Sequence, residues 1–179
     1  MKLFGILAGA LLCVSLANAE NSRTGLFLSA GAGLDGGKLS AYGDDGYKIR
    51  GIQDAVLNGR IGYAPIPNLA VYGIGSLSAY ITTEDDDGHS LLYLGGGATY
   101  WLPGDFLVSA SVGANRFFAE ESSLDDGFGL GFRVSVGKDW RIFSWGALGV
   151  EAFYGHAEVD GGDAWNGNFV GFLFNVSYL

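Results

Sequence analysis

The chain has 179 residues, of which 49% are hydrophobic and only 16% are charged. A soluble domain has about 25% charged residues, so this composition leaves little polar material to cover a surface that faces water. The formal net charge of −9 argues against a nucleic-acid-binding protein, because phosphate binding requires a basic surface. Glycine contributes 31 residues and proline three, a mixture that is typical of neither collagen nor a linker.

Residues 1–19 have the three parts of a secretory signal peptide. Lys2 gives a positive start, residues 3–16 form a short apolar run, and residues 17–19 (Ala-Asn-Ala) give a small-x-small cleavage site. The apolar run is shorter than the roughly 20 residues that a membrane-spanning helix needs. We therefore expect residues 1–19 to be a cleaved signal peptide and residues 20–179 to form one mature domain. Cys13 lies in the signal peptide, so the mature chain has no disulfide and no thiol site.

The mature chain alternates apolar residues with small or polar residues, and this period of two is typical of β-strands. The clearest case sets Phe128, Leu130 and Phe132 against Gly129 and Gly131. Strands of about 9 to 11 tilted residues suffice to cross a bilayer. In chain order, we predict eight strands near residues 24–33, 54–64, 69–81, 90–102, 106–115, 128–137, 147–154 and 170–178.

The connections between these strands alternate between short and long, as in outer-membrane barrels with periplasmic turns and extracellular loops. The short ones are expected at residues 65–68, 103–105 and 138–141, and the long ones at residues 35–51, 82–89, 118–127 and 157–165. The long segments hold 14 acidic and three basic residues, a joint charge of −11. We therefore predict an all-β, eight-stranded antiparallel transmembrane up-and-down β-barrel in the bacterial outer membrane, with acidic extracellular loops and periplasmic termini.

The distribution of charge decides which face of the sheet meets lipid. The predicted strands contain only five charged residues when Arg116, at the end of the fifth strand, is included, whereas a soluble ligand-carrying barrel needs a charged exterior. Gly, Ser, Asn and Thr on the less apolar face fit inside a narrow barrel, so we expect the apolar face to lie against hydrocarbon. Five aromatic residues near strand ends on that face are predicted to form an interfacial girdle: Tyr63, Tyr100, Phe106, Tyr154 and Tyr178.

The strand layout, short turns and glycine-rich interior resemble the OmpA/OmpX-type and opacity-type family of small outer-membrane barrels. A local segment is similar to a stretch that recurs in bacterial outer-membrane β-barrel proteins: VGKDW at residues 136–140 followed by WGALGV at residues 145–150. The resemblance implies a fold and a location but no activity. One departure is that Leu179 follows Tyr178, where the family usually ends its last strand with an aromatic residue.

The charged residues of the predicted interior are Asp54, Arg60, Arg133 and Glu151, of which Arg60, Arg133 and Glu151 come from three different strands. A buried charge is costly unless it is paired, so we expect a salt-bridged and hydrogen-bonded plug. The alternative is a narrow conducting path, which would make the protein a small porin-like channel. Asp54 is placed at the outer mouth and fits either arrangement.

Acidic clusters in the predicted loops offer oxygen ligands for a hard cation such as calcium, although none has the EF-hand spacing. A solvated surface is the simpler interpretation, and we predict no cofactor and no dedicated metal site. The residues concerned are Glu84, Asp85, Asp86, Asp87, Asp125 and Asp126. The expected partners are outer-membrane lipid and lipopolysaccharide, the barrel-insertion machinery, and host or envelope surface ligands.

Catalysis has little support in the sequence. A lipid A deacylase would place a His and a Ser two residues apart on a lipid-facing strand, together with an acid. Here His89 and Ser90 are adjacent, and His156 is followed by Glu158 without a nearby serine. We therefore predict a structural and surface-interaction protein rather than an enzyme, and a lipid-modifying envelope enzyme is the least favoured alternative.

Overall fold

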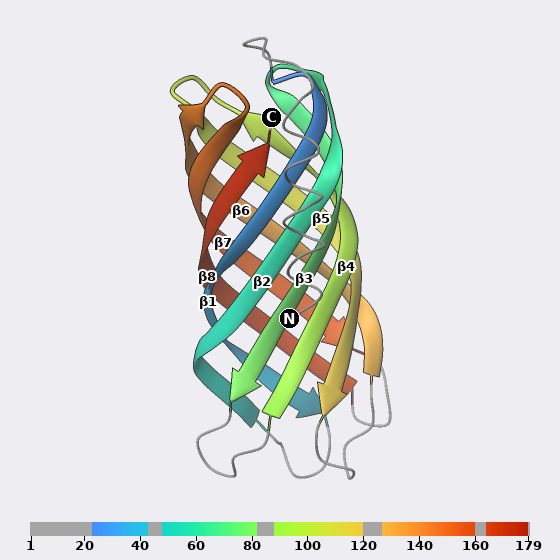
Figure 1. Cartoon of the computed structure of the whole chain (residues 1–179). Helices are drawn as coiled ribbons and strands as arrows, with labels where there is room; N and C mark the ends of the chain where they lie inside the picture. The colour runs from blue at the N-terminus through green and yellow to red at the C-terminus, as the bar shows by residue number, and fades with distance from the viewer. Residues whose placement is uncertain (1–22, 43–47, 82–87, 120–126, 160–163, 179) are drawn as a thin grey trace, which may run out of the picture.

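The computed structural model describes residues 23–42, 48–81, 88–119, 127–159 and 164–178. Within these residues, eight strands pair antiparallel with their chain neighbours, and the last strand pairs with the first, which closes a barrel (Figure 1). The predicted fold class is therefore confirmed. The described part contains no helix that is long and apolar enough to cross a membrane. The strands are β1 (Gly25–Tyr42), β2 (Lys48–Ile66), β3 (Leu69–Ile81), β4 (Gly88–Trp101), β5 (Phe106–Ala119), β6 (Gly127–Phe143), β7 (Gly146–Val159) and β8 (Ala164–Tyr178).

Residues that lie opposite each other on neighbouring strands define a path around the barrel, and this path does not return to the residue from which it started. A path from partner to partner that starts at Phe106 in β5 returns to β5 at Arg116, ten residues further on, so the shear number is ten. With about 3.4 Å per residue and about 4.8 Å between strands, this shear tilts the strands by about 40° from the barrel axis. The path runs through Phe106, Lys138, Val150, Phe174, Ala32, Leu57, Leu77, Leu92 and Arg116.

The two faces of the sheet have opposite chemistry. Outward positions carry large apolar side chains that are exposed, for example Leu130 at 70% and Phe174 at 68%. Inward positions are occupied by Ser, Asn, Thr, Gly and a few large residues that fill the interior. Gly171 is inward-facing, and a Cβ on it would lie 2.6 Å from Cζ of Phe153, so glycine leaves the space that this ring occupies. An apolar exterior of this extent is typical of a surface that meets membrane hydrocarbon.

The strands are longer than the sequence pattern indicated. β1 and β2 remain paired up to Ser40 and Lys48, inside the segment 35–51 that was expected to be a loop. The expected turn at residues 138–141 is wrong, because β6 continues to Phe143 and the turn lies at residues 144–145. The reason is that the polar residue Asp139 faces the interior, where it has a hydrogen-bond donor, and the alternation continues beyond it.

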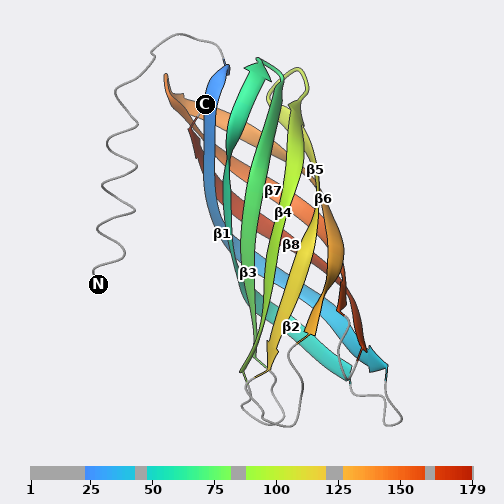
Figure 2. The same cartoon turned by 90° about the vertical axis from the view of Figure 1, so that its right-hand side faces the viewer.

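The two ends of the barrel differ. Figure 2 shows the short connections and the C-terminus at one end, here called the turn end. The other strand ends, which border residues 43–47, 82–87, 120–126 and 160–163, lie at the opposite end, here called the loop end, and those bordering residues lie outside the described ranges. The signal peptide predicted for residues 1–19 also lies outside them.

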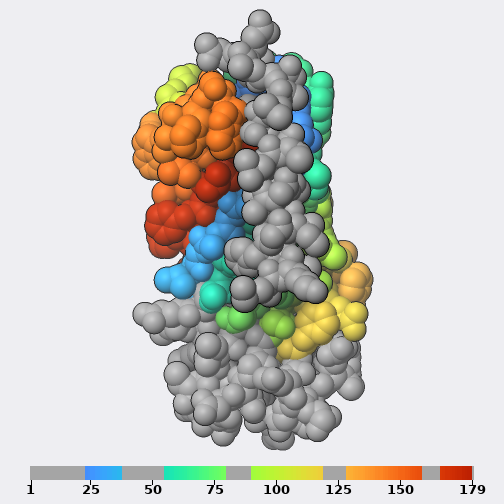
Figure 3. All heavy atoms as spheres, in the orientation of Figure 1, coloured from blue at the N-terminus to red at the C-terminus, as the bar shows by residue number. Residues whose placement is uncertain are grey.

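The predicted girdle residues face outward, mostly at the turn end. Tyr63, Tyr100, Phe106 and Tyr154 are exposed, and Tyr178 is half-buried. The ring of Trp145 lies 6.3 Å from the ring of Tyr178 and stacks on Phe143 at 5.0 Å, so further aromatic residues gather at this end. Bulky side chains of the orange hairpin between β6 and β7 project from the wall there (Figure 3). That these residues form an interfacial girdle stays a prediction.

Candidate functional site

The centre of the barrel holds an ion pair that crosses the lumen. Nη1 and Nη2 of Arg60, in β2, donate hydrogen bonds of 2.8 Å each to the two carboxylate oxygens of Glu151, in β7. Both side chains are almost fully buried, at 3% and 2% exposure. The bidentate geometry gives a planar guanidinium its strongest arrangement with a carboxylate.

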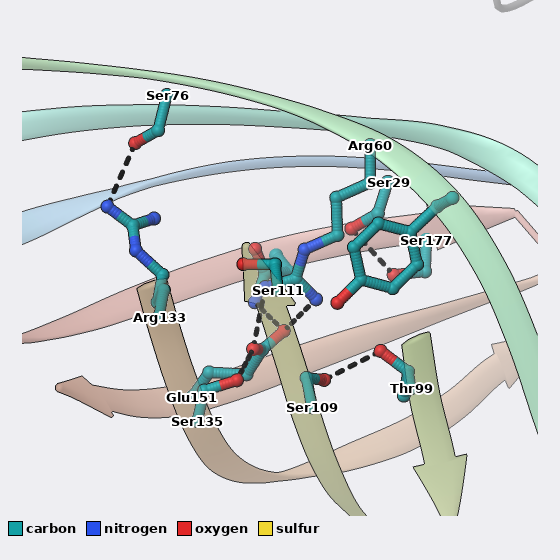
Figure 4. A network of polar contacts seen from close by, with 12 residues as sticks. Ser29, Arg60, Ser76, Thr99, Ser109, Ser111, Arg133, Ser135, Glu151 and Ser177 are labelled. Atoms are coloured by element: carbon teal, nitrogen blue, oxygen red, sulfur yellow. Dashed lines mark hydrogen bonds and ion pairs between the residues drawn. The ribbon is translucent and has the colours of Figure 1, made fainter. Parts of the chain in front are cut away.

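Two further residues complete the surroundings of the Glu151 carboxylate. Ser135 donates its hydroxyl to Oε2 at 2.7 Å (Figure 4), and Nδ2 of Asn175 donates to Oε1 at 2.9 Å. The carboxylate therefore accepts four hydrogen bonds from β2, β6 and β8. We call Arg60, Ser135, Glu151 and Asn175 the central layer.

The tilt of the strands explains why these residues meet. The ladder that starts at Glu151 leads over three strand steps to Val56 in β2. Because the strands are tilted, the residue of β2 at the same height along the barrel axis as Glu151 is not Val56. With a shear of ten over eight strands, three steps place that residue about four positions closer to the turn end. That position is Arg60, whose guanidinium also lies 5.3 Å from the ring centroid of Tyr72.

Arg133 lies at a different level, closer to the loop end, and the structure does not bring it to Glu151. Its guanidinium carbon lies 4.3 Å from the ring centroid of Phe153 and 5.7 Å from that of Tyr93. Nη2 donates to the hydroxyl of Ser76 at 3.2 Å. Two aromatic faces thus contribute to holding this cation, which is a favourable arrangement when water is excluded.

A small cavity lies beside Arg133. Its volume is about 10 Å³, enough for roughly one water molecule. Ser76, Tyr93 and Asn115 contribute to its lining, and Nδ2 of Asn115 is buried without a hydrogen-bond partner in the described part of the chain. The interior at this level is therefore filled by side chains, with space for a water molecule next to polar groups.

Near the outer mouth, the acidic side chain that the structure describes inside the lumen is that of Asp35. The side chain of Asp54 lies outside the described residues, although its backbone pairs with Asp35. Asp35, which was expected in a loop, is buried in the lumen and accepts a hydrogen bond of 2.8 Å from the hydroxyl of Ser78. The signal was present in the sequence, because Phe27, Ser29 and the following inward positions place residue 35 in the same phase.

An aromatic cap closes the turn end, and sequence reasoning missed it. The rings of Trp101 and Phe27 form a T-shaped pair with centroids 5.8 Å apart, and Trp101 donates Nε1–H to the carboxylate of Asp139 at 2.8 Å. The guanidinium of Arg23 lies 4.8 Å from the Trp101 ring centroid and forms an ion pair with Asp105. We call Arg23, Phe27, Trp101 and Asp139 the turn-end cap.

Arg23 precedes β1, outside the strands, and its charge is partly shielded from water. Burial, and after it the nearby charge of Arg141, lower the pKa of the Arg23 guanidinium, whereas Asp105 and Asp139 act in the opposite direction. Arginine nevertheless stays protonated in proteins. The cap is therefore held by a permanent cation stacked on an indole ring.

The side chains that were considered for metal binding or catalysis lie outside the described ranges or on the outer wall of the barrel. Among the described residues, no group of three or more His, Cys, Asp or Glu side chains is arranged to hold a metal ion. The acidic residues that were considered as cation ligands, Glu84, Asp85, Asp86, Asp87, Asp125 and Asp126, lie outside the described ranges, as does the side chain of His89. His156 faces outward beside Glu158, across the wall from the buried serines of the lumen. Arg116 also faces outward, with its guanidinium 4.9 Å from the ring centroid of Phe118.

A closed antiparallel barrel with an apolar outside and a filled, polar inside is the architecture of small outer-membrane β-barrel proteins. Solved structures of this class are similar to the chain in fold. Neisserial surface protein A (NspA) aligns with a TM-score of 0.63 at 16% identity, over 87% of this chain and 97% of NspA. Ail of Yersinia pestis gives 0.54 at 12% identity, over 86% and 99%, and OprG of Pseudomonas aeruginosa gives 0.51 at 15%, over 88% and 97%.

At these identities the similarity establishes the fold and not a role. No family model matches the sequence, and no curated protein matches it. The chain therefore has the fold of the small eight-stranded outer-membrane barrels.

Proposed function

We propose that this protein is an integral outer-membrane barrel with a closed lumen, and that it acts through its loop end as a structural and surface-interaction protein. The observation that carries the proposal is the central layer, in which a cation and an anion from opposite walls join across the lumen. The turn-end cap closes the interior a second time. Eight strands leave an interior just wide enough for side chains, which agrees with this arrangement.

The loop end is the part that remains for interaction. The four connections there, at residues 43–47, 82–87, 120–126 and 160–163, contain 12 acidic residues and no Lys or Arg. The number is smaller than the 14 expected because Asp35 and Glu158 belong to strands, as do the three bases Lys38, Lys48 and Arg50. The connections themselves therefore carry only negative charge, and the three bases lie on the adjoining loop-end part of β1 and β2.

The location and partners belong to the same proposal. Residues 1–19 would direct the chain across the inner membrane, and the barrel-insertion machinery would place it in the outer membrane with short turns in the periplasm. The apolar exterior would lie against membrane lipid. The acidic connections would bind the divalent cations that bridge lipopolysaccharide molecules, or ligands on host and envelope surfaces. Ail, which shares the fold, is described as an attachment invasion locus protein, a role of this surface-interaction class.

Conductance in planar bilayers tests the closed lumen. The mature protein, with insertion checked by its heat-dependent migration on a gel, should give no discrete openings. Replacing Arg60, Glu151 and Trp101 together by serine widens both closed levels and should produce openings, whereas the outward substitution Leu57→Ser should stay silent. Reproducible openings of the unmodified protein would instead favour the porin-like channel.

A further inference from the structure

A group of polar side chains interrupts the apolar exterior on β7 and β8. The hydroxyl of Tyr154 donates to Oδ1 of Asn168 at 2.7 Å, and Nδ1 of His156 lies 2.9 Å from the same oxygen. Nε2 of His156 lies 3.4 Å from Oε1 of Glu158. We call Tyr154, His156, Glu158 and Asn168 the outer polar cluster. All four side chains point away from the lumen, on the loop-end half of the two strands.

The neighbouring strand remains apolar beside this cluster. The ring of Phe132, in β6, lies 5.6 Å from the His156 ring and 6.0 Å from the Tyr154 ring. Leu130, the next outward residue of β6 toward the loop end, is 70% exposed. Polar groups and an aromatic face therefore lie side by side at the edge of the apolar exterior.

An apolar groove begins at the cluster and extends toward the turn end across the outer wall of β5 to β8. Its volume is about 500 Å³, within the roughly 300–1,000 Å³ that small-molecule sites have. The small residue Ala152 lies between its ladder partners Val136 and Phe172, which makes the wall concave there. Tyr154 lines the groove and belongs to the outer polar cluster, so the two features form one amphipathic surface.

The chemistry of this surface indicates one kind of occupant. The apolar groove fits an acyl chain, and its polar end faces the loop end, where a lipid of the outer leaflet has its headgroup. The charged side chain of the cluster is the carboxylate of Glu158, which repels phosphate and accepts hydrogen bonds. The amide of Asn168, the imidazole of His156 and the face of Phe132 suit a sugar with several hydroxyl groups.

We infer that the outer wall of β6 to β8 is a binding site for an acylated sugar, a glycolipid of the outer leaflet. The acyl chain lies in the groove over Ala152, and sugar hydroxyls bond with His156, Glu158 and Asn168. The inference rests on the proposed function for the orientation of the barrel in the outer membrane. It assigns the site to the wall and not to the acidic connections at the loop end.

Native mass spectrometry with two amphiphiles of equal chain length tests the site. The mature protein, in a short-chain ether detergent, is given either dodecyl maltoside or dodecylphosphocholine. One retained maltoside per barrel, in preference to the phosphocholine, is expected. Ala152→Phe fills the groove and should lower maltoside retention about tenfold, because the chain loses apolar burial. Ala55→Phe places the same bulk on an outward position of β2 and should leave retention unchanged.

The headgroup is tested separately. Asn168→Ala should lower retention of dodecyl maltoside and leave that of dodecylphosphocholine as it was. Equal retention by the unmodified protein and Ala152→Phe would overturn the site, and preferential retention of the phosphocholine would overturn the sugar assignment. A dimer that Ala152→Phe dissociates, without a lipid adduct, would show instead that the groove is an interface between copies.

Two controls separate maltoside binding from barrel folding and from closure of the lumen. The heat-dependent gel migration of each variant shows whether the barrel has formed. The variant with serine at positions 60, 101 and 151 should retain maltoside like the unmodified protein, because its changes lie inside the barrel. In the unmodified protein, an open lumen with maltoside retained would contradict the proposed function alone, and a closed lumen without maltoside would contradict this inference alone.

Discussion

Two arginines of the same lumen, Arg60 and Arg133, are accommodated differently. Arg60 forms a bidentate ion pair with Glu151, and that carboxylate is also held by Ser135 and Asn175. Arg133 lies against the rings of Phe153 and Tyr93 and donates to Ser76. The first arrangement concentrates four hydrogen bonds on one acid, whereas the second spreads over several weaker contacts. The barrel should therefore depend far more on one side chain of the central layer than on any one contact of Arg133.

The largest effect is expected from Glu151→Ala. The substitution leaves the Arg60 guanidinium buried without its carboxylate, and breaking such a pair costs about 3–5 kcal/mol. Urea unfolding in lipid vesicles measures the free energy. Replacing both Arg60 and Glu151 by methionine should recover most of the loss, since no unpaired charge is left. A double variant as unstable as Glu151→Ala would contradict this account.

An intermediate effect is expected at the turn-end cap from Trp101→Phe. The variant keeps an aromatic ring against Phe27 but removes the N–H that bonds with Asp139, at a cost of about 1–3 kcal/mol for a buried acceptor left without its donor. Combining Trp101→Phe with Asp139→Leu should reduce that cost, again by urea unfolding. A purely steric role for the tryptophan predicts no such recovery.

The smallest effect is expected from Arg133→Met, which keeps much of the apolar stem and removes the charge. Cation–π contacts contribute about 0.5–2 kcal/mol, so the loss should stay below that of Glu151→Ala. The same unfolding assay gives the comparison directly. If Arg133→Met were as costly as Glu151→Ala, the contrast between the two arginines would be wrong.

The strand number, the alternation and the faces could be predicted from the sequence, because a period of two shows which residues share a side. The sixth strand illustrates this, since Phe128 and Leu130 face outward and Arg133 faces inward as expected. Strand ends were harder. Asp35 and Asp139 are polar residues near expected boundaries, but each has a hydrogen-bond donor inside the lumen that no local pattern reveals.

The pairing inside the lumen was not predictable for a geometric reason. The sequence placed Arg60, Arg133 and Glu151 in the interior phase of different strands, but which of them are level depends on the shear number. A shear of ten brings Arg60 to Glu151 and leaves Arg133 elsewhere. The turn-end cap was not predicted because Arg23 precedes the first predicted strand. The alternation assigns Trp101 to the inward face of its strand but does not indicate the partners of its ring and its N–H.

The seam between β1 and β8 has a consequence for how fast the native state can be reached. Leu28 pairs with Tyr178, and Ser177 donates to Ser29 across 148 positions of the chain. Contacts between such distant segments form late, because the entropy of closing the intervening loop must be lost first. Until that final zippering step the sheet has two open edges, and Arg60 and Glu151 remain in contact with solvent. Sealing the seam and dehydrating the interior should therefore be one cooperative event at the end of assembly.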